Sequence, residues 1–543
     1  MEPMNPDQFD YIIPYKQYCD YLRYTHPSKR FDDSSLRRRY DEYKESFQAK
    51  QLANFFDTNK DKQWFLEKYH PVLSIPRKQE LKQRRLRYFN QFMDDLNRGL
   101  LDNVELDEGK TYTINNKAKK QSQQMEGDDD QNTNEDNQDI YENRLVIKTV
   151  LPTISRENIL KLCETVDGFD YLALSEPGPN RRFHRIGWIN FKEGTDMQQA
   201  FDQLDNKTVD DFVFHLAMNR KNQEPLPRTP RLALEISNTE ERLKHDMEQS
   251  YTLAKAMDTF LDVKGAKQVV ERANEIGDIT DLESEMISKQ DDNDNDDDID
   301  HKSSSMIYIK KKLDLMITYL RRVHMMCYYC GLECDSIEDL DRKCMEPHCR
   351  KIIDKSTQGV SSSGSEKGGI AWAKNLDSKL ALKFEKPRQR TLERMGGKLL
   401  DDELDKFYDD HIQREHSSKY RCKVDDCNKA FRGIEFAEKH ITSKHPEHIN
   451  RIKEQTTFYN NYICDPNHLT PQTNHVRNNT NLMNNVIGTM TMTSTNLGGS
   501  PVPMVRSATS LLDSMMPRDP RQVTSYVDLD APAQGDNNGP VFY

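Results

Sequence analysis

A complete set of zinc ligands in the C-terminal third of the chain constrains its fold most. Cys422 and Cys427 are separated by four residues, twelve more precede His440, and another four precede His445. Zinc prefers a tetrahedron of thiolate and imidazole ligands, and this spacing matches a cysteine pair on a hairpin and a histidine pair on a helix. The specificity of the spacing disfavours the alternative of four unrelated residues. The segment from Tyr420 onward is too short to fold by burial alone, so the metal is expected to stabilise it.

The predicted finger helix lacks the side chains that read DNA. Counting back from His440, the positions facing base edges are Gly433, Glu435, Phe436 and Lys439. A glycine, an acid and a phenyl ring offer little base recognition, and a single finger reads only about three base pairs. Lys439 and Lys444 instead form a basic face that is predicted to hold phosphate or an acidic peptide. A DNA-binding transcription regulator is the alternative function.

The composition indicates folded parts joined by disordered segments. Of 543 residues, 31% are charged and 35% hydrophobic, which is too polar for a chain folded throughout. The net charge of -12 is concentrated in the acidic runs at 126–139 and 291–300. Disorder is therefore predicted for an acidic linker at 111–140, an acidic insertion at 286–304 and a tail at 465–543. A Gly/Ser-rich linker or loop is predicted at 354–369.

Several function classes have no support in the sequence. No apolar run reaches the roughly 18 residues that span a bilayer, and no signal-peptide core begins the chain, so a soluble intracellular protein without membrane contact is expected. Ten cysteines then indicate reduced thiols and zinc ligands rather than disulfides. Phosphate-cradling, metalloprotease and serine-hydrolase motifs are missing, so the protein is predicted not to be an enzyme.

The first 110 residues alternate apolar and charged positions at helical spacing, which predicts a basic helical N-terminal domain over 1–110. Basic side chains gather at 37–39 and 77–87. These runs either neutralise RNA phosphates or form solvated helix faces.

Residues 141–225 have a β-α-β-β-α-β rhythm, which predicts an atypical RNA-recognition-motif domain. Among the positions where such sheets stack bases, only Trp188 is aromatic, whereas Val146 and Ile186 are aliphatic. Each lost stacking platform removes about 1–3 kcal/mol per base, so only weak RNA binding is predicted. The candidate RNA-binding residues are Arg144, Lys148, Arg185 and Trp188. Alternatively, Trp188 packs beneath a flanking helix.

Residues 226–415 are predicted to be a helical core and 416–455 the zinc-finger domain, which makes the fold class α+β, multidomain and mostly helical. A second possible zinc site lies at 327–349, with the ligands Cys327, Cys330, Cys344 and His348. Because Cys334 and Cys349 are surplus, a cluster of free, partly buried thiols is the alternative. One or two zinc ions and a monomeric chain are expected.

Five segments resemble the Serrate / arsenite-resistance protein 2 family, in particular its fungal-type members. They occur in family order and include FFDTNKDKQWFLEKYHP at 55–71 and the finger KYRCKVDDCNKAFRGIEFAEKHITSKH at 419–445. The others are LDLMITYLRRVHMMCYYCGLECDSIEDLDRKC at 313–344, WAKNLDSKLALKFEKPRQR at 372–390 and DPRQVTSYVDLDAP at 519–532.

The resemblance implies a non-enzymatic nuclear adaptor. Such a protein links the cap-binding complex on capped RNA polymerase II transcripts to machinery for RNA processing, exosome-linked decay or silencing. In the family, the basic finger surface, here Lys439 and Lys444, docks acidic short linear motifs of RNA-processing or exosome-adaptor proteins. The tail residues that match the element engaging the cap-binding complex are Arg521, Tyr526, Asp528, Leu529 and Asp530. On composition alone, this stretch also fits a tail without a docking role.

Overall fold

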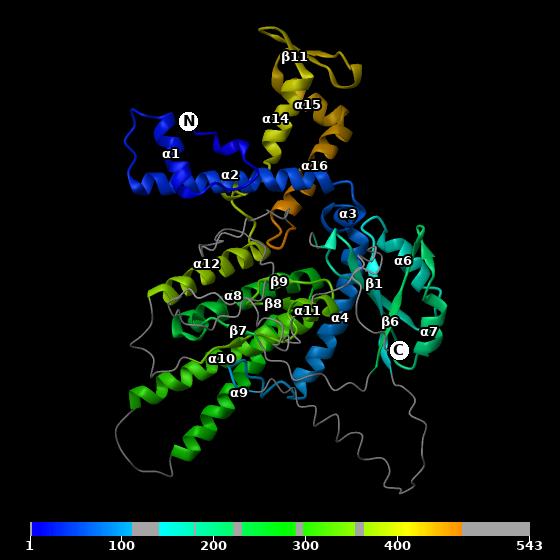
Figure 1. The fold of residues 1–543 in the computed structure, drawn as a ribbon, viewed down its shortest axis with the longest axis vertical. Coiled ribbons are helices and arrows are strands. Elements are labelled where there is room, and N and C mark those ends of the chain that lie inside the picture. The colour runs from blue at the N-terminus through cyan, green and yellow to red at the C-terminus, as the bar shows by residue number, and fades with distance from the viewer. Residues whose placement is uncertain are drawn as a thin grey trace, which may run out of the picture. The chain divides into compact units, whose positions relative to one another are not determined.

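The computed structural model describes residues 3–110, 141–178, 181–220, 231–288, 297–352 and 363–469 (Figure 1). All of them fall within one unit of contacting chain, Met1–Thr489. The linker at 111–140 and the tail beyond residue 469 lie outside the described residues, so the predictions for them stay predictions. Within the described ranges, no helix is both long enough and apolar enough to cross a membrane.

The N-terminal region is helical, as its periodicity predicts, but its helices contribute to different cores. The 3-10 turn η1 (Pro6–Gln8) precedes α1 (Tyr15–Thr25), α2 (Asp33–Asn59), α3 (Gln63–Tyr69) and α4 (Ile75–Asn97). Asp32 caps α2 by accepting a hydrogen bond from the backbone N–H of Ser35. Helices α2 and α3 share an aromatic cluster with α16 (Pro446–Ile463), whereas α4 packs into the central helical core. The region 1–110 is thus divided between neighbouring parts of the molecule.

The next part confirms the predicted RNA-recognition-type order. The elements are β1 (Tyr141–Val150), α6 (Arg156–Cys163), β2 (Phe169–Leu174), β3 (Arg185–Phe191), α7 (Met197–Leu204) and β6 (Leu216–Arg220). A short hairpin of β4 (Thr208–Val209) and β5 (Phe212–Val213) precedes β6. The antiparallel sheet has the order β2-β3-β1-β6, and one of its faces packs on α6 and α7. Gly187 allows β3 to approach β1 closely, because a Cβ there would lie 2.7 Å from Ile147.

Helix α10 lies at the centre of the helical core, where it packs on α4, α8 and α9 (Figure 1). The core consists of β7 (Leu232–Ala233), η3 (Glu235–Asn238), α8 (Glu240–Leu261), α9 (Gly265–Ser288), α10 (Asp297–His324) and α12 (Ser363–Phe384). Between α10 and α12 lie β8 (Met326–Cys327), β9 (Leu332–Glu333), α11 (Ile337–Lys343) and β10 (Cys349–Arg350). Apolar side chains from α4, α8, α9, α10 and α12 form a single buried cluster, which includes Phe92, Leu253, Val269, Leu320 and Leu380.

One segment predicted to be disordered and one predicted to be a loop are helical over part of their length. Helix α9 continues to Ser288 and α10 begins at Asp297, so of the predicted insertion 286–304 only 289–296 lies outside the described residues. Helix α12 begins at Ser363, within the predicted Gly/Ser loop 354–369. Helix propagation explains both corrections, because each added residue extends an existing helix without the cost of a new nucleus.

The finger is larger than the predicted 416–455 segment. Helix α13 (Gln389–Arg394) leads to α14 (Leu400–His411), then β11 (Ile412–His416), β12 (Lys419–Cys422), η5 (Val424–Asp426), β13 (Ala430–Phe431) and α15 (Ile434–Lys444). The strands form a sheet in the order β11-β12-β13. The buried core of the finger contains Val424, Ala437 and Ile441. Ile412 from β11 and Ile449 from α16 also belong to it. Phe431 and Tyr420 pack against this core.

Candidate metal centres and docking surface

The four predicted finger ligands come together at one point. Cys422 ends β12 and is fully buried, and the histidines lie on α15 and at its C-cap. The Cys427 Sγ lies 3.2 Å from His440 Nε2 and the Cys422 Sγ 3.9 Å from His445 Nε2, and all four ligand atoms are within 4.8 Å of one another. Zn–S and Zn–N bonds of about 2.3 and 2.0 Å place tetrahedral ligand atoms roughly 3.3–3.8 Å apart, so the arrangement fits zinc.

The loop between the two cysteines has the backbone geometry of a tight knuckle. Asp425 has φ of 46° and Asn428 of 55°, which are left-handed conformations that aspartate and asparagine tolerate. The backbone N–H of Cys427 donates to the carbonyl of Val424 at 2.9 Å. The Asp425 carboxylate also lies 3.7 Å from Nδ1 of His445, on the ring side opposite the ligand atom. A carboxylate in this position orients a metal-binding imidazole and increases its basicity.

The second predicted ligand set also converges. Cys330 Sγ lies 3.2 Å from His348 Nε2, Cys344 Sγ lies 3.5 Å from Cys327 Sγ, and the four ligand atoms are within 4.8 Å of one another. Gly331, with φ of 59°, provides the turn that follows the first cysteine pair. Of the surplus cysteines, Cys334 is buried beside Leu340 and Cys349 lies in β10. Neither belongs to a metal-compatible group among the described residues.

Burial and mutual hydrogen bonds change the pKa values of the residues in the second cluster. Hydrogen bonds from Cys327 and Cys330 lower the pKa of the Cys344 thiol. Burial alone would lower the pKa of His348, but hydrogen bonds with Cys330 and Cys344 outweigh it and raise that pKa to about 9. Zinc binding at this cluster is therefore expected to release protons and to strengthen as the pH rises.

Metal analysis of the purified full chain is expected to give two zinc ions per molecule, because both ligand sets are assembled. Cys330→Ser should reduce the count to one, because thiolate is the stronger zinc ligand. Cys349→Ser is the matched control, since it alters a neighbouring buried cysteine outside the cluster. A wild-type count of one that Cys330→Ser does not change would mean that residues 327–349 hold only free thiols.

The exposed side chains of α15 are both basic and apolar. Lys439 and Lys444 are exposed, and neither has an ion-pair partner among the described residues. Phe436 is 60% exposed and Ile434 39% exposed on the same helix. Phe436 and Lys439 are neighbours on the helix surface, three residues apart, whereas Ile434 and Lys444 lie on other sides near its two ends. We call the exposed side chains of Ile434, Phe436, Lys439 and Lys444 together the α15 face. Exposed apolar side chains beside unpaired cations suit a partner that is both acidic and apolar.

The four candidate RNA-binding residues do not form one exposed surface, which corrects the prediction for them. Trp188 is 8% exposed, and Arg185 is 5% exposed, with its guanidinium 3.3 Å from the Glu67 carboxylate. Arg144 donates to Glu142, and only Lys148 is exposed. Of the alternatives for Trp188, the structure favours packing in the interior.

Helices of the protein itself contact the sheet of the RNA-recognition-type domain. The Tyr171 hydroxyl on β2 donates to the carboxylate of Glu338 on α11 at 2.7 Å. The guanidinium of Arg84, on α4, lies 4.2 Å from the centroid of the Tyr171 ring. The sheet therefore uses an aromatic side chain to contact the protein's own helices. The five tail residues predicted to dock lie outside the described residues.

The fold and its sites define a mostly helical multidomain protein that contains an RNA-recognition-type domain and two Cys/His clusters suited to zinc. The Serrate/Ars2 N-terminal domain model matches residues 23–130, the Serrate RNA effector molecule homolog RNA-recognition domain matches 142–221, and the arsenite-resistance protein 2 model matches 357–534. A domain of unknown function, DUF4187, matches 300–348, which includes the second cluster. The chain belongs to the Serrate / arsenite-resistance protein 2 family.

Individual relatives agree with the family. The chain is 26% identical over 468 residues to the NURS complex subunit pir2 of Schizosaccharomyces pombe, an alignment that covers 82% of this chain and 71% of that protein. It is 25% identical over 348 residues to the human Serrate RNA effector molecule homolog, covering 59% of this chain but only 38% of the human protein. A solved structure from work on miRNA processing by Arabidopsis Serrate covers 83% of this chain and 97% of that chain, with 16% identity and a TM-score of 0.24. That score is too low to compare the domain arrangement.

Proposed function

We propose that this chain is a non-enzymatic nuclear adaptor for RNA. It connects the cap-binding complex on capped RNA polymerase II transcripts with RNA-processing, decay or silencing machinery. The names of its relatives, an RNA effector molecule and a NURS complex subunit, support this class of function. The single observation that carries the proposal is the α15 face, where unpaired lysines and exposed apolar side chains sit on a helix fixed by a metal-compatible cluster.

In this proposal, the α15 face binds acidic short linear motifs. Zinc at Cys422, Cys427, His440 and His445 fixes the helix before the partner arrives, so little ordering entropy is lost on binding. Lys439 and Lys444 attract the acidic side chains, and Phe436 contacts an apolar side chain of the motif. The tail segment 519–532 provides the second contact, with the cap-binding complex.

The double variant Lys439→Glu with Lys444→Glu is expected to weaken binding of an acidic peptide by at least about tenfold, because attraction becomes repulsion. The probe is a fluorescent peptide rich in Asp and Glu with one central leucine, followed by fluorescence anisotropy. Zinc content should not change, since both lysines are exposed and neither is a ligand.

A matched control replaces Lys255 and Lys374, which are exposed on α8 and α12, with glutamate. It makes the same change in net charge away from the α15 face. If both double variants bind the peptide equally well, the α15 face is not the docking surface.

Affinity purification from nuclear extract tests the adaptor role as a whole. The full chain is expected to recover the cap-binding subunits, and deletion of 519–543 is expected to lose them. Recovery of DNA-associated factors alone, unaffected by the deletion, would instead favour the DNA-binding regulator.

A further inference from the structure

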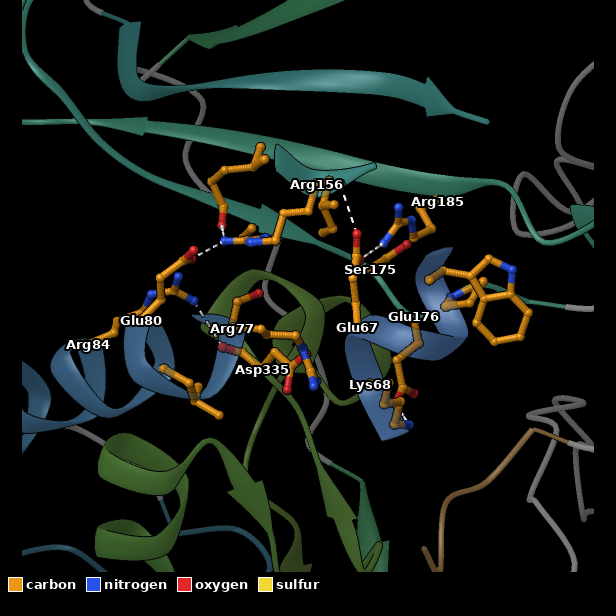
Figure 2. Close-up of a pocket in the computed structure, with 17 residues that line it drawn as sticks. Glu67, Lys68, Arg77, Glu80, Arg84, Arg156, Ser175, Glu176, Arg185 and Asp335 are labelled. Atoms are coloured by element: carbon orange, nitrogen blue, oxygen red, sulfur yellow. Dashed lines mark hydrogen bonds and ion pairs between the residues drawn. The ribbon is translucent and has the colours of Figure 1, made fainter. Parts of the chain in front are cut away.

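A small polar cavity lies where three parts of the chain meet. Helices α3 and α4 form one wall, the RNA-recognition-type domain forms another, and Asp335 and Ser336 of the helical core close the third side (Figure 2). Its volume is about 50 Å³, several times the roughly 10–15 Å³ that one water requires. The charged residues that line it are Glu67, Lys68, Arg77, Glu80, Arg84, Arg156, Glu176, Arg185 and Asp335.

The lining carries one more positive than negative charge, since five of these side chains are basic and four are acidic. Each acid already has a basic partner: Glu67 with Arg185, Glu80 with Arg156, Glu176 with Lys68, and Asp335 with Arg77. Arg84 is the remaining cation. It is 5% exposed and donates to the backbone carbonyl of Asp335 at 3.0 Å. The nearby buried carboxylate of Glu338 is engaged by the Tyr171 hydroxyl and lies 4.0 Å from Arg144.

Burial weakens the hydration of three guanidinium groups that line the cavity. Within the described chain, the Nε atoms of Arg84, Arg156 and Arg185 are buried and have no hydrogen-bond partner. Burial and the neighbouring charge of Arg156 lower the pKa of Arg84. Burial likewise lowers the pKa of Arg185, against the opposing effect of Glu67. A lining with more cations than anions, in which Arg84 has no carboxylate partner of its own, favours a negatively charged ligand.

We propose that the cavity binds a small oxyanion of the phosphate class. Figure 2 shows Arg84 reaching in from α4 and Arg156 from the RNA-recognition-type domain, with Glu80 and Asp335 beside them. Guanidinium groups present planar pairs of donors that match the oxygens of a phosphate group. A bound oxyanion bridges α4 and the sheet domain, so it strengthens the contact between them. The proposal does not depend on the adaptor function.

Thermal unfolding of the full chain in sodium phosphate, compared with sodium chloride at equal ionic strength, tests the site. Saturating phosphate is expected to raise the melting temperature by a few degrees, because ligand binding stabilises the folded state by mass action. Arg84→Met should remove the part of the rise that exceeds the non-specific stabilisation by phosphate. It should still fold, since an apolar side chain of similar length replaces a buried cation that has no ion-pair partner among the described residues. Arg87→Met is the control, because Arg87 lies on the same helix but is half exposed and pairs with Asp170. An unchanged phosphate response in Arg84→Met would overturn the proposal.

A measurement on the wild-type protein keeps the test independent of how the variant folds. In arginine-labelled full chain, phosphate is expected to shift a small set of Nε–Hε resonances, and to do so saturably. Shifts that are equal in phosphate and chloride would also overturn the site.

The source of the oxyanion can be separated with RNA probes. An oligoribonucleotide with a 5′-phosphate that binds more tightly than its 5′-hydroxyl counterpart, and competes with free phosphate, would assign the site to an RNA end. Equal binding of the two oligonucleotides, together with the phosphate response, would assign it to the free ion.

Discussion

Cys422→Ala is expected to unfold residues 420–449 and abolish binding of the acidic peptide. Structural zinc contributes about 10–16 kcal/mol of apparent binding free energy in finger peptides, far more than this small core can replace. Cys422 is also fully buried at the centre of the finger cluster, where it packs with Val424 and Ala437. Loss of one zinc per chain, measured by metal analysis, should accompany loss of peptide binding.

The rest of the chain should stay folded in this variant. The finger core and the central helical core are separate buried clusters, so far-ultraviolet circular dichroism should retain most of its helical signal. Cys464→Ala is the control, because Cys464 is a half-buried cysteine outside both metal-compatible clusters. A Cys422→Ala protein with full zinc content and unchanged peptide affinity would contradict the assigned ligand set.

Arg350→Met is expected to cost about 3–5 kcal/mol of stability at neutral pH, because it leaves the buried carboxylate of Asp314 without its cation, whereas Asp107 keeps its pair with Lys310. Arg350 is fully buried, pairs with Asp314 at 2.6 Å and donates from Nε to Asp107 at 2.9 Å. Urea unfolding followed by tryptophan fluorescence measures the loss. Arg394→Met is the control, since its pair with Glu45 is on the surface and contributes only about 0–1 kcal/mol.

The pH dependence of this variant has a definite sign. Burial raises the pKa of Asp314 even beside Arg350, so without Arg350 the carboxyl should hold its proton to a still higher pH. A raised pKa in the folded state favours folding at low pH, and that advantage is lost as the pH rises above the unfolded value of about 3.9. The difference between wild type and variant should therefore narrow toward pH 4. If the difference in the free energy of unfolding between wild type and Arg350→Met stays constant from pH 7 to 4, the unpaired Asp314 carboxylate is not the cause of the lost stability.

Local patterns were sufficient to predict the ligand set of the finger and the order of the sheet domain. Cys422 and His440 could be paired because zinc ligation depends on spacing within one short segment. The strands could be placed because alternating burial, as at Leu145 and Ile147, is a property of the strand itself. The second set could be narrowed to four ligands only by the structure, which places Cys334 and Cys349 outside the cluster.

Long-range contacts could not be predicted in this way. Tyr171 and Glu338 are 167 residues apart in the chain, and nothing in either neighbourhood indicates that they meet. Arg84 belongs to the basic run at 77–87, for which the sequence allowed two interpretations: a solvated helix face or an RNA-binding surface. In the structure it is buried over the Tyr171 ring. The prediction that Arg185 and Trp188 lie on an RNA-binding surface was wrong for the same reason. Their burial depends on tertiary contacts, which the local sequence does not reveal.

Helix α16 connects the finger to the aromatic cluster near the N-terminus. Ile449, in its first turns, belongs to the finger core, whereas Phe458 and Tyr462 pack with Phe56 and Phe65 of α2 and α3. An α-helix advances about 1.5 Å and turns about 100° with each residue. The length of α16 therefore sets both the distance between the finger and the aromatic cluster and the rotation of the α15 face about the axis of α16. One residue added to the middle of α16 would rotate the finger, and any partner docked on it, relative to the aromatic cluster. The zinc ligands and Lys439 and Lys444 would keep their arrangement within the finger.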